Sequence, residues 1–236
     1  MKKIVVLTGA GISAESGIST FRDSDGLWEN HRIEDVATPE GWRRNPKLVQ
    51  EFYNQRRRRL GEVVPNAGHL ALVELEQQFE IHIVTQNVDD LHERAGSTHV
   101  LHLHGELRKV RSDRHEHLVY DWDKDLLMGE LCERGSQLRP HIVWFGEAVP
   151  LLETAAELAA EAEVFIIVGT SLQVYPAASL MVYASRHIPF YYVDPRPQVN
   201  AELARMPNLQ IIAEPATTGL PKVVAELMGR GQADFV

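Results

Sequence analysis

Hydrophobic residues in this chain occur in two patterns: short unbroken runs, and longer stretches in which they recur every three or four positions. Unbroken runs rich in β-branched residues are typical of strands buried on both faces of a sheet, and the longer spacing is typical of helices with one apolar face. The predicted strands are Ile4–Leu7, Ile81–Thr85, Val164–Val168 and Phe190–Val193. The predicted helices are Pro46–Leu60, Ala67–Gln78, Leu151–Glu161 and Pro221–Met228.

Strands and helices alternate along most of the chain, which predicts an α/β fold with a parallel sheet. Two polar-rich segments, residues 26–61 and 105–142, lack a clear buried parallel strand. We therefore expect a sheet domain made of residues 1–25, 62–104 and 143–236, with the two other segments together forming a smaller domain. Ligands of such sheets bind at the carboxyl ends of the strands.

The first predicted strand runs directly into a glycine-rich turn, which is typical of a phosphate cradle. Gly9 and Gly11 permit close approach of the backbone to a ligand, Ser13 and Ser16 offer hydroxyl groups, and the following helix presents its N-terminal amides. The spacing departs from the usual dinucleotide fingerprint, so the glycines could instead serve only the packing of the turn.

Polar residues also follow the later strands. Gln86, Asn87 and Asp89 can bind ribose hydroxyls and a carboxamide, although Asn87 or Asp89 could simply cap the next helix. Asp194 could hold a ribose diol or serve as a turn residue before a proline. The remaining strand-end residues of this kind are Gly169, Thr170 and Ser171.

Composition narrows the class of protein. Of the 236 residues, 44% are hydrophobic, which is enough for a substantial core. The formal net charge of −9 disfavours nonspecific nucleic-acid binding and could favour the approach of basic partners. No apolar run approaches membrane-spanning length and no secretory segment is evident, so we expect no membrane association and a cytoplasmic location. The single cysteine, Cys132, excludes an internal disulfide.

Three histidines lie close together at His99, His102 and His104, but no cysteine or further acidic residue lies beside them at metal-ligand spacing. We expect structural roles for His99 and His102. His104 differs because Gly105 follows it, which allows a ligand to approach closely. A histidine beside a nucleotide ribose can act as a general base near neutral pH.

Five ordered motifs cover most of the chain between residues 9 and 180: GAGISAESGISTFRDSDGLW, TQNVDDLH, HLHGEL, PHIVWFGE and VGTSLQVYPAASL. Together they resemble the sirtuin family, and most closely its bacterial NAD-dependent protein deacylases; AEPATTGLP adds a weaker match near the end. The resemblance implies a Rossmann-like domain and a small domain, with NAD and an acyl-lysine peptide meeting in the cleft between them. It also implies that NAD is consumed, giving nicotinamide, free lysine and O-acyl-ADP-ribose.

The same resemblance implies the roles of individual residues. His104 would be the catalytic base, while Asn87 and Asp89 would position the nicotinamide end and a water. Phosphate and ribose would meet residues 169–171, and Asp194 and Ala216 would lie at the adenosine end, where many relatives carry asparagine in place of the aspartate. The other expected cofactor contacts are Gly9, Ala10, Gly11, Ser13, Glu15, Phe21, Arg22, Trp28 and Gln86.

Acyl preference is expected to depend on Tyr53 and Arg56, which are three residues apart and therefore share one helix face. This Tyr-x-x-Arg pair resembles the one by which succinyl, malonyl and glutaryl deacylases hold the distal carboxylate. An alternative remains, because Arg56 begins a run of four arginines and such runs usually form a solvated face. Ala37 matches a small residue that widens the acyl pocket, and the lysine channel is expected to consist of Val143, Trp144 and Phe145.

The chain departs from the family in lacking the four cysteines that hold a structural zinc in most relatives. Asp113, His115, His117 and Cys132 could form a mixed tetrahedral site, but their spacing matches no usual one. We therefore expect no structural zinc. A small apolar cluster is expected to replace the metal, formed by Leu118, Tyr120, Trp122, Leu126, Leu127 and Leu131.

Other functions remain open at this point. The same fold could belong to a peptide-independent NAD hydrolase or an ADP-ribosyl transferase, although the channel residues and the Tyr53–Arg56 pair argue for a peptide substrate. An oxidoreductase would need a substrate acid/base site that the sequence does not show. A passive NAD-binding module would not need His104.

Overall fold

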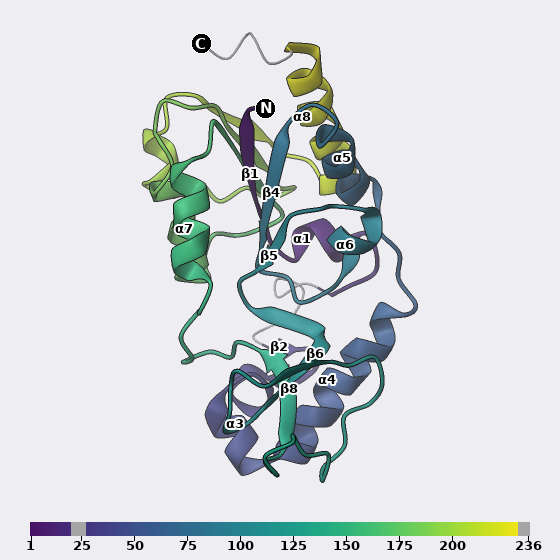
Figure 1. Cartoon of the computed structure of the whole chain (residues 1–236). Helices are drawn as coiled ribbons and strands as arrows, with labels where there is room; N and C mark the ends of the chain where they lie inside the picture. The colour runs from purple at the N-terminus through teal and green to yellow at the C-terminus, as the bar shows by residue number, and fades with distance from the viewer. Residues whose placement is uncertain (20–26, 231–236) are drawn as a thin grey trace.

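The computed structural model describes residues 1–19 and 27–230. Figure 1 shows two parts, a larger one built on a sheet and a smaller one below it. The expected cofactor residues Phe21 and Arg22 lie outside the described residues.

Six parallel strands form the main sheet in the order β11-β10-β9-β1-β4-β5, which confirms the expected α/β fold with a Rossmann-like parallel sheet. The four predicted strands are present, and two further strands were missed, β5 and β11. The strand bounds are β1 Lys3–Thr8, β4 Glu80–Thr85, β5 Val100–His102, β9 Val164–Val168, β10 Phe190–Val193 and β11 Leu209–Ile212.

The strand order reverses between β1 and β9. From β1 the chain builds outward through β4 and β5, and from β9 it builds in the other direction through β10 and β11. Thr8 at the end of β1 is paired with Thr85 and with Val168, so the carboxyl ends of these three strands meet at one edge. Ligands of open parallel sheets bind at such a reversal, which places the expected site above β1 and β9.

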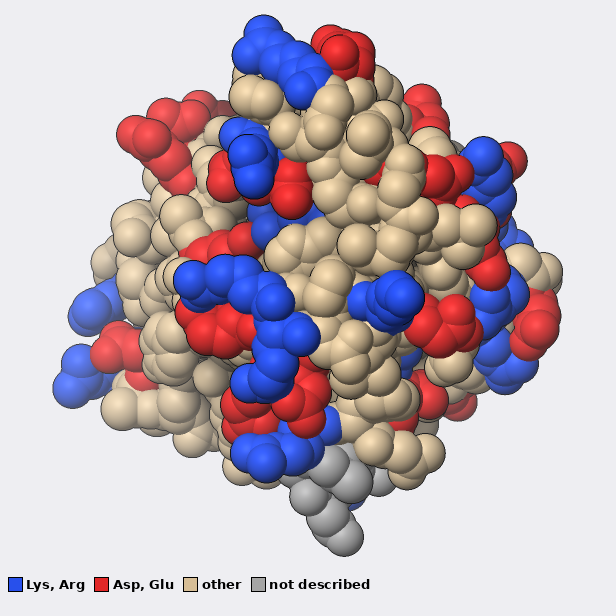
Figure 2. Space-filling model, turned by 90° about the horizontal axis from the view of Figure 1, so that it is seen from below, with Lys and Arg blue, Asp and Glu red and all other residues tan. Residues whose placement is uncertain are grey.

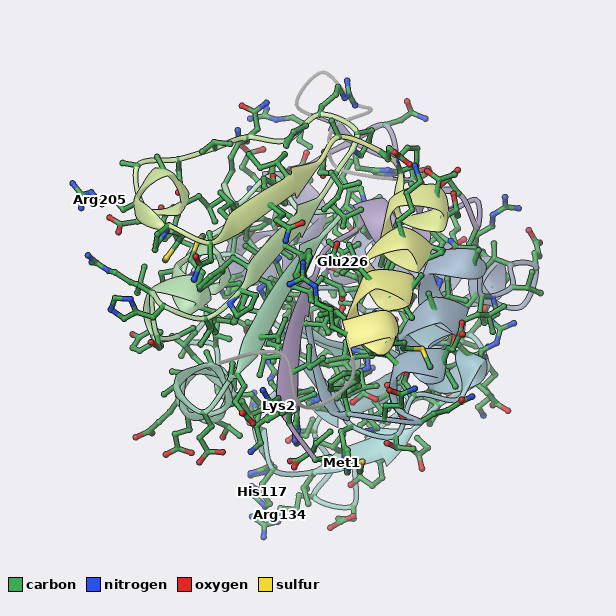
Figure 3. The ribbon with its side chains drawn as sticks, turned by 90° about the horizontal axis from the view of Figure 1, so that it is seen from above. Met1, Lys2, His117, Arg134, Arg205 and Glu226 are labelled. Atoms are coloured by element: carbon green, nitrogen blue, oxygen red, sulfur yellow. The ribbon has the colours of Figure 1, made fainter. Side chains whose placement is uncertain are left out.

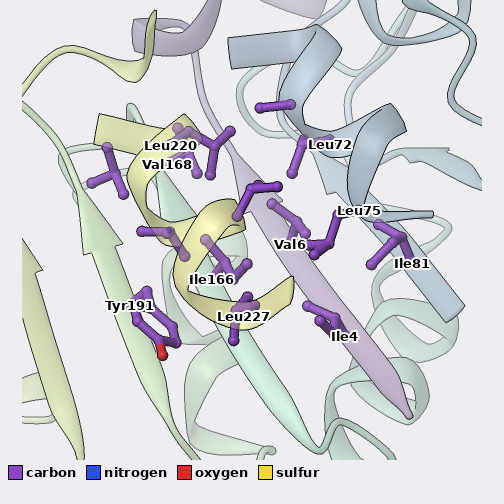
Figure 4. Packing of buried hydrophobic residues seen from close by; sticks show 14 of the residues in the cluster. Ile4, Val6, Leu72, Leu75, Ile81, Ile166, Val168, Tyr191, Leu220 and Leu227 are labelled. Carbon is purple, nitrogen blue, oxygen red and sulfur yellow. The ribbon is translucent and has the colours of Figure 1, made fainter. Parts of the chain in front are cut away.

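Helices cover both faces of the main sheet. On one face, Ile4 and Val6 of β1 pack against α5 (Ala67–Leu75) and α8 (Ala216–Arg230), as Figure 4 shows. On the other face, Val5 and Leu7 pack beneath α7 (Leu152–Ala160) and a 3-10 helix, Ala177–Val182. Two short helices, α1 (Gly11–Ala14) and α6 (Leu91–Ala95), follow the ends of β1 and β4.

The smaller part is formed by the two segments that do not fit the alternation. The first supplies a strand pair and three helices: β2 Leu27–Trp28, β3 His31–Arg32, α2 Ile33–Val36, α3 Pro39–Arg44 and α4 Pro46–Leu60. The second supplies an antiparallel sheet of β6 (Gly105–Ser112), β7 (Val119–Asp121) and β8 (Leu138–Ile142) in the order β7-β6-β8. The exact domain boundaries stay a prediction.

The apolar cluster of the second segment differs from the expected one. Leu126 is buried together with Val110, Cys132 and Leu138, and Leu118, Tyr120 and Trp122 pack against them. Leu127 and Leu131 were wrongly included, because their side chains point outward and are 60% and 54% exposed.

The surface of the smaller part carries charges of both signs. Seen from below, Lys and Arg side chains lie next to Asp and Glu side chains rather than forming one patch (Figure 2). Two of these pairs are Arg43 with Glu40 and Arg44 with Asp35. Among the described helices, none combines the length and apolar character needed to cross a membrane.

Candidate active site

A cavity of about 440 Å³ lies between the main sheet and the smaller part. It opens above the strand reversal and is lined from both sides, by the turns after β1, β4, β9 and β10 and by residues of the smaller part. Of the predicted site residues, it brings together Gly9, Ala10, Gly11, Glu15, Trp28, Ala37, Tyr53, Gln86, Asn87, Asp89, His104, Val143, Trp144, Phe145, Gly169, Thr170, Ser171 and Asp194.

The glycine-rich turn serves packing as well as the cavity. Gly11 donates its backbone N–H to Gly169 O at 2.8 Å, and a Cβ atom on Gly11 would lie 2.6 Å from the Gly169 Cα. The two turns can therefore approach each other only because neither carries a side chain. The packing use considered from the sequence is confirmed, and the packed turns also form part of the cavity wall, where phosphate binding stays a prediction.

The polar residues after β4 are held in a buried network. Ser13 Oγ donates to Asp89 Oδ2 at 2.9 Å, and the Asn87 amide donates to Gly9 O at 3.1 Å and to Ser13 Oγ at 3.3 Å. Asp89 Oδ1 also accepts the Leu91 N–H at the start of α6, although the N-cap residue of that helix is Asp90 rather than Asn87 or Asp89. Burial raises the pKa of Asp89. Ser13 lies behind the cavity wall rather than on it.

His104 is half-buried and lines the cavity. Its Nδ1 lies 3.0 Å from Gln86 O. A carbonyl oxygen can only accept, so Nδ1 carries the hydrogen and Nε2 is the basic nitrogen of the neutral ring. Burial lowers the pKa of His104, and the hydrogen bond to Gln86 opposes this only in part. A neutral imidazole with a defined basic nitrogen suits a general base.

The close approach at Gly105 is not to a ligand as expected. A Cβ atom there would lie 2.0 Å from His141 O, so Gly105 is required by the backbone of β8. The other two histidines have structural contacts: His102 bonds Asn87 O and Glu93, and His99 stacks on His82 with ring centroids 5.1 Å apart.

Of the two residues expected at the adenosine end of NAD, Asp194 lines the cavity and Ala216 does not. Asp194 is 2% exposed, lines the cavity and accepts the Arg196 N–H at 2.8 Å, so it is also a turn residue. Glu15 lines the cavity and accepts the Thr217 hydroxyl. Ala216 is buried at the start of α8 and is not part of the cavity wall.

Residues of the smaller part, together with residues 143–147 that follow β8, form the opposite wall. The Val143 N–H donates to His104 O at 2.9 Å, which joins this wall to the side that carries His104, and the Phe145 N–H donates to Ala37 O at 3.0 Å within the wall. Trp144 is 2% exposed, and its indole N–H donates to Tyr53 Oη at 3.1 Å.

Arg56 lines an adjoining cavity of about 400 Å³ rather than the main one, which corrects the expectation that it shares one pocket with Tyr53. The two cavities share Trp28 and Asp89 among their walls. The guanidinium lies over the Phe52 ring, 3.2 Å from its centroid, and that ring packs edge-on against Trp28 of β2 with centroids 4.9 Å apart. Arg56 Nη2 is buried and has no hydrogen-bond partner among the residues described.

The four arginines of the run do not form one solvated face. Arg57 is 2% exposed and donates to Leu107 O and Asn54, whereas Arg58 and Arg59 are exposed and paired with acids.

No group of three or more His, Cys, Asp or Glu residues within 1–19 and 27–230 is arranged to hold a metal ion. The suggested ligands therefore do not form a mixed site: His117 is exposed at the edge of the molecule (Figure 3), and Cys132 is buried beside Ser112. The absence of a structural zinc stays a prediction.

Several residues of the site were missed from the sequence. Tyr175 and Arg196 line the cavity, and their positions just after the two later strands could have indicated them. Arg111, Arg139 and Glu147 form a buried ion cluster behind Trp144, and no sequence pattern pointed to it.

Comparison with known proteins agrees with this geometry. Residues 9–176 match the model of the Sir2 family. The chain belongs to the Sir2 family. It is 58% identical over 228 residues to a Helicobacter pylori NAD-dependent protein deacylase, covering 97% of this chain and 98% of that protein, and 51% identical to one from Bacteroides thetaiotaomicron, covering 94% and 97%.

Two solved structures place this fold beside known ligands. A Sir2 homologue in complex with NAD is 36% identical with a TM-score of 0.86, covering 97% of this chain and 90% of that one. Sir2Af2 bound to a myristoylated histone peptide is 33% identical with a TM-score of 0.69, covering 95% and 90%. NAD is the co-substrate in this family, and the paired turns after β1 and β9 with the amides and carboxylates of the β4 turn are suited to hold it.

Proposed function

We propose that this NAD-dependent protein deacylase acts preferentially on lysines carrying succinyl, malonyl or glutaryl groups, and that it also accepts acetyl-lysine. The observation that supports the acyl preference is Arg56, whose Nη2 is buried without a described partner beside the cavity that holds Tyr53. A buried donor of this kind is costly unless an acceptor reaches it.

The charge on Arg56 fits this role. Burial lowers its pKa to about 10, so the guanidinium remains protonated at neutral pH. A carboxylate is the natural partner of a protonated guanidinium because its two oxygens can accept from the fork of N–H groups. The distal carboxylate of a dicarboxylic acyl group would supply that acceptor, with Tyr53 as a second contact from the main cavity.

The remaining residues divide between the two co-substrates. Bound NAD supplies the ribose carbon that loses nicotinamide and accepts the acyl oxygen. Asn87 and Asp89 hold its reactive end in place, and the turn at 169–171 offers backbone amides and hydroxyls to phosphate and ribose. His104 takes a proton from a ribose hydroxyl at Nε2. Val143, Trp144 and Phe145 enclose the stem of the acyl-lysine.

The test compares Arg56→Met with Arg58→Met, since Arg58 lies on the same helix but pairs with Glu51 and Asp125 outside both cavities. Matched succinyl-lysine and acetyl-lysine peptides are assayed by mass spectrometry. We expect Arg56→Met to lower kcat/KM for the succinyl peptide about 10- to 100-fold, as for a lost hydrogen bond to a charged group. The acetyl reaction and the Arg58→Met variant should change less than about 3-fold.

Equal losses on both peptides, or removal of acetyl alone by the unaltered enzyme, would overturn the acyl preference. NAD loss that does not depend on an acyl peptide would instead favour an NAD hydrolase or an ADP-ribosyl transferase of the same fold.

A further inference from the structure

A buried ion cluster lies behind the wall that carries Trp144. Glu147 accepts from Arg139 Nη1 at 2.7 Å and from Arg111 Nη2 at 3.2 Å, and both arginines are about as buried as core residues, at 6% and 5% exposed. Arg111 and Arg139 face each other directly across β6 and β8. Two like charges in that register repel each other, so the cluster depends on the carboxylate between them.

The cluster fixes Trp144 at two points. Glu147 Oε2 accepts the Trp144 backbone N–H at 2.8 Å, and the Arg139 guanidinium lies 3.3 Å from the centroid of the indole ring. A guanidinium over an aromatic face is attracted to it, most strongly where both are removed from water. The indole is therefore oriented by Glu147, which lines the cavity, and by Arg139, which lies behind the cavity wall.

That orientation determines the hydrogen bonding of Tyr53. The Trp144 indole nitrogen can only donate, so Tyr53 Oη must accept at the 3.1 Å contact. The phenol hydrogen then points elsewhere, and it meets no acceptor among the residues that the structure describes. Tyr53 lines the main cavity, next to the cavity of Arg56, so the available hydrogen can be donated to a ligand oxygen there.

We propose that Trp144, held by the Glu147–Arg139–Arg111 cluster, is a positioning residue that keeps the Tyr53 hydroxyl as a donor to the distal carboxylate of the acyl group. The inference rests on the proposed acyl preference. It adds that discrimination between acidic and neutral acyl groups is controlled by a charge cluster behind Trp144, of which only Glu147 lines the main cavity.

The test is a double-mutant cycle with Trp144→Phe and Tyr53→Phe, measured on matched succinyl and acetyl peptides. Trp144→Phe keeps an aromatic ring but removes the N–H donor. Because Trp144 also lines the channel that both peptides use, the readout is the ratio of the two KM values. We expect Trp144→Phe to raise KM for the succinyl peptide about 3- to 10-fold more than KM for the acetyl peptide. In the Tyr53→Phe background the same change should have no further effect on the ratio of the two KM values, because the hydroxyl is gone.

Equal effects on both peptides, or an undiminished effect on that ratio in the Tyr53→Phe background, would show that Trp144 only shapes the channel and would overturn the inference. Absence of desuccinylation by the unaltered enzyme is a different outcome, since it overturns the proposed acyl preference itself. Glu147→Gln serves as a second variant that leaves the indole in place. It should shift the ratio of the two KM values in the same direction as Trp144→Phe, and an unchanged ratio would contradict the role of the cluster.

Discussion

At the scale of single residues, the chemistry of the candidate site depends first on which ring nitrogen of His104 carries the proton. Its contact with Gln86 O assigns that proton to Nδ1 and leaves Nε2 basic. Gln86 is itself tied to Thr170 by its side-chain amide at 3.1 Å, so the tautomer is supported by a residue from the turn after β9. The proposed base is therefore oriented by the same turns that line the main cavity.

His104→Ala should abolish turnover and retain the fold, with a loss of about 10²- to 10⁴-fold in kcat/KM on an acyl peptide. The control is His99→Ala, which changes an exposed histidine outside the cavity. Circular dichroism checks the fold of both variants. Retained activity in His104→Ala would contradict its role as the base.

The lowered pKa of His104 also predicts the pH profile. The base works only when neutral, so activity should fall as pH decreases through a pKa below the ordinary value of 6.5. A profile of kcat/KM from about pH 5 to 8 locates this acid limb. A midpoint above 6.5 would mean that another group controls it.

Among the elements, the segment that carries the sheet β7-β6-β8 contains a single cysteine, Cys132, so it cannot be held together by a four-cysteine metal site. Leu126 is 1% exposed within its apolar cluster, and Asn54 of α4 bonds both the N–H and the C=O of Leu126. Apolar packing and this bridge to α4 therefore hold the segment between β7 and β8.

Leu126→Ala should lower the free energy of unfolding by about 2–5 kcal/mol, because it empties a buried site. Leu127→Ala is a matched control one residue away, 60% exposed, and should change it by less than about 0.5 kcal/mol. Urea unfolding measures both. We also expect a metal chelator to leave the thermal midpoint unchanged, and a chelator-induced drop would restore the case for a structural metal.

Whether a strand can be predicted from the sequence depends on how much of it is buried. β1, β9 and β10 are buried along nearly their whole length and read as unbroken apolar runs. β11 is half exposed at the edge of the sheet and β5 has three residues, so neither produces such a run. The predicted start of α8 at Pro221 was five residues late, because a proline is typical of a first turn and here lies inside the helix.

The residues of the candidate site were predictable from the sequence where polar side chains directly follow the end of a strand. Gln86, Asn87 and Asp89 follow β4 directly, and parallel strands bring such turns together at one edge. The ion cluster of Arg111, Arg139 and Glu147 was not predictable, because its members come from three separate segments and charged residues are usually expected at the surface.

At the scale of the whole molecule, packing of α5 and α6 beside the end of β1 brings two buried histidines close to the candidate active site. His69 of α5 and His92 of α6 lie in contact beneath the turns, with ring centroids 5.0 Å apart. His69 Nε2 lies 3.5 Å from Ser13 Oγ, and His92 Nε2 lies 3.1 Å from Thr8 Oγ1. Burial lowers the pKa of His69 to about 4 and that of His92 well below its ordinary value.

Protonating either ring would place a cation where solvent does not reach the side chain and next to a second imidazole. The unfolded chain has no such restriction, so its histidines take up protons near pH 6.5. Between that pH and about 4 the unfolded state binds more protons than the folded state, and stability must fall as the pH falls. Acid therefore weakens the fold at the centre of the active site.

His69→Gln removes one of these protonations and keeps an oxygen that can accept the Asn66 N–H now bound to His69 Nδ1. The variant should be less stable at neutral pH, yet it should lose about 2 kcal/mol less than the unaltered protein between about pH 7 and pH 5. Urea unfolding at the two pH values measures the difference, with the exposed His187→Gln as the control that keeps the original pH dependence. If His69→Gln and the unaltered protein lost equal stability, the buried histidine would not be the source of acid sensitivity, and the paired carboxylates Glu93 and Glu147, whose pKa values are lowered, would be the groups to test next.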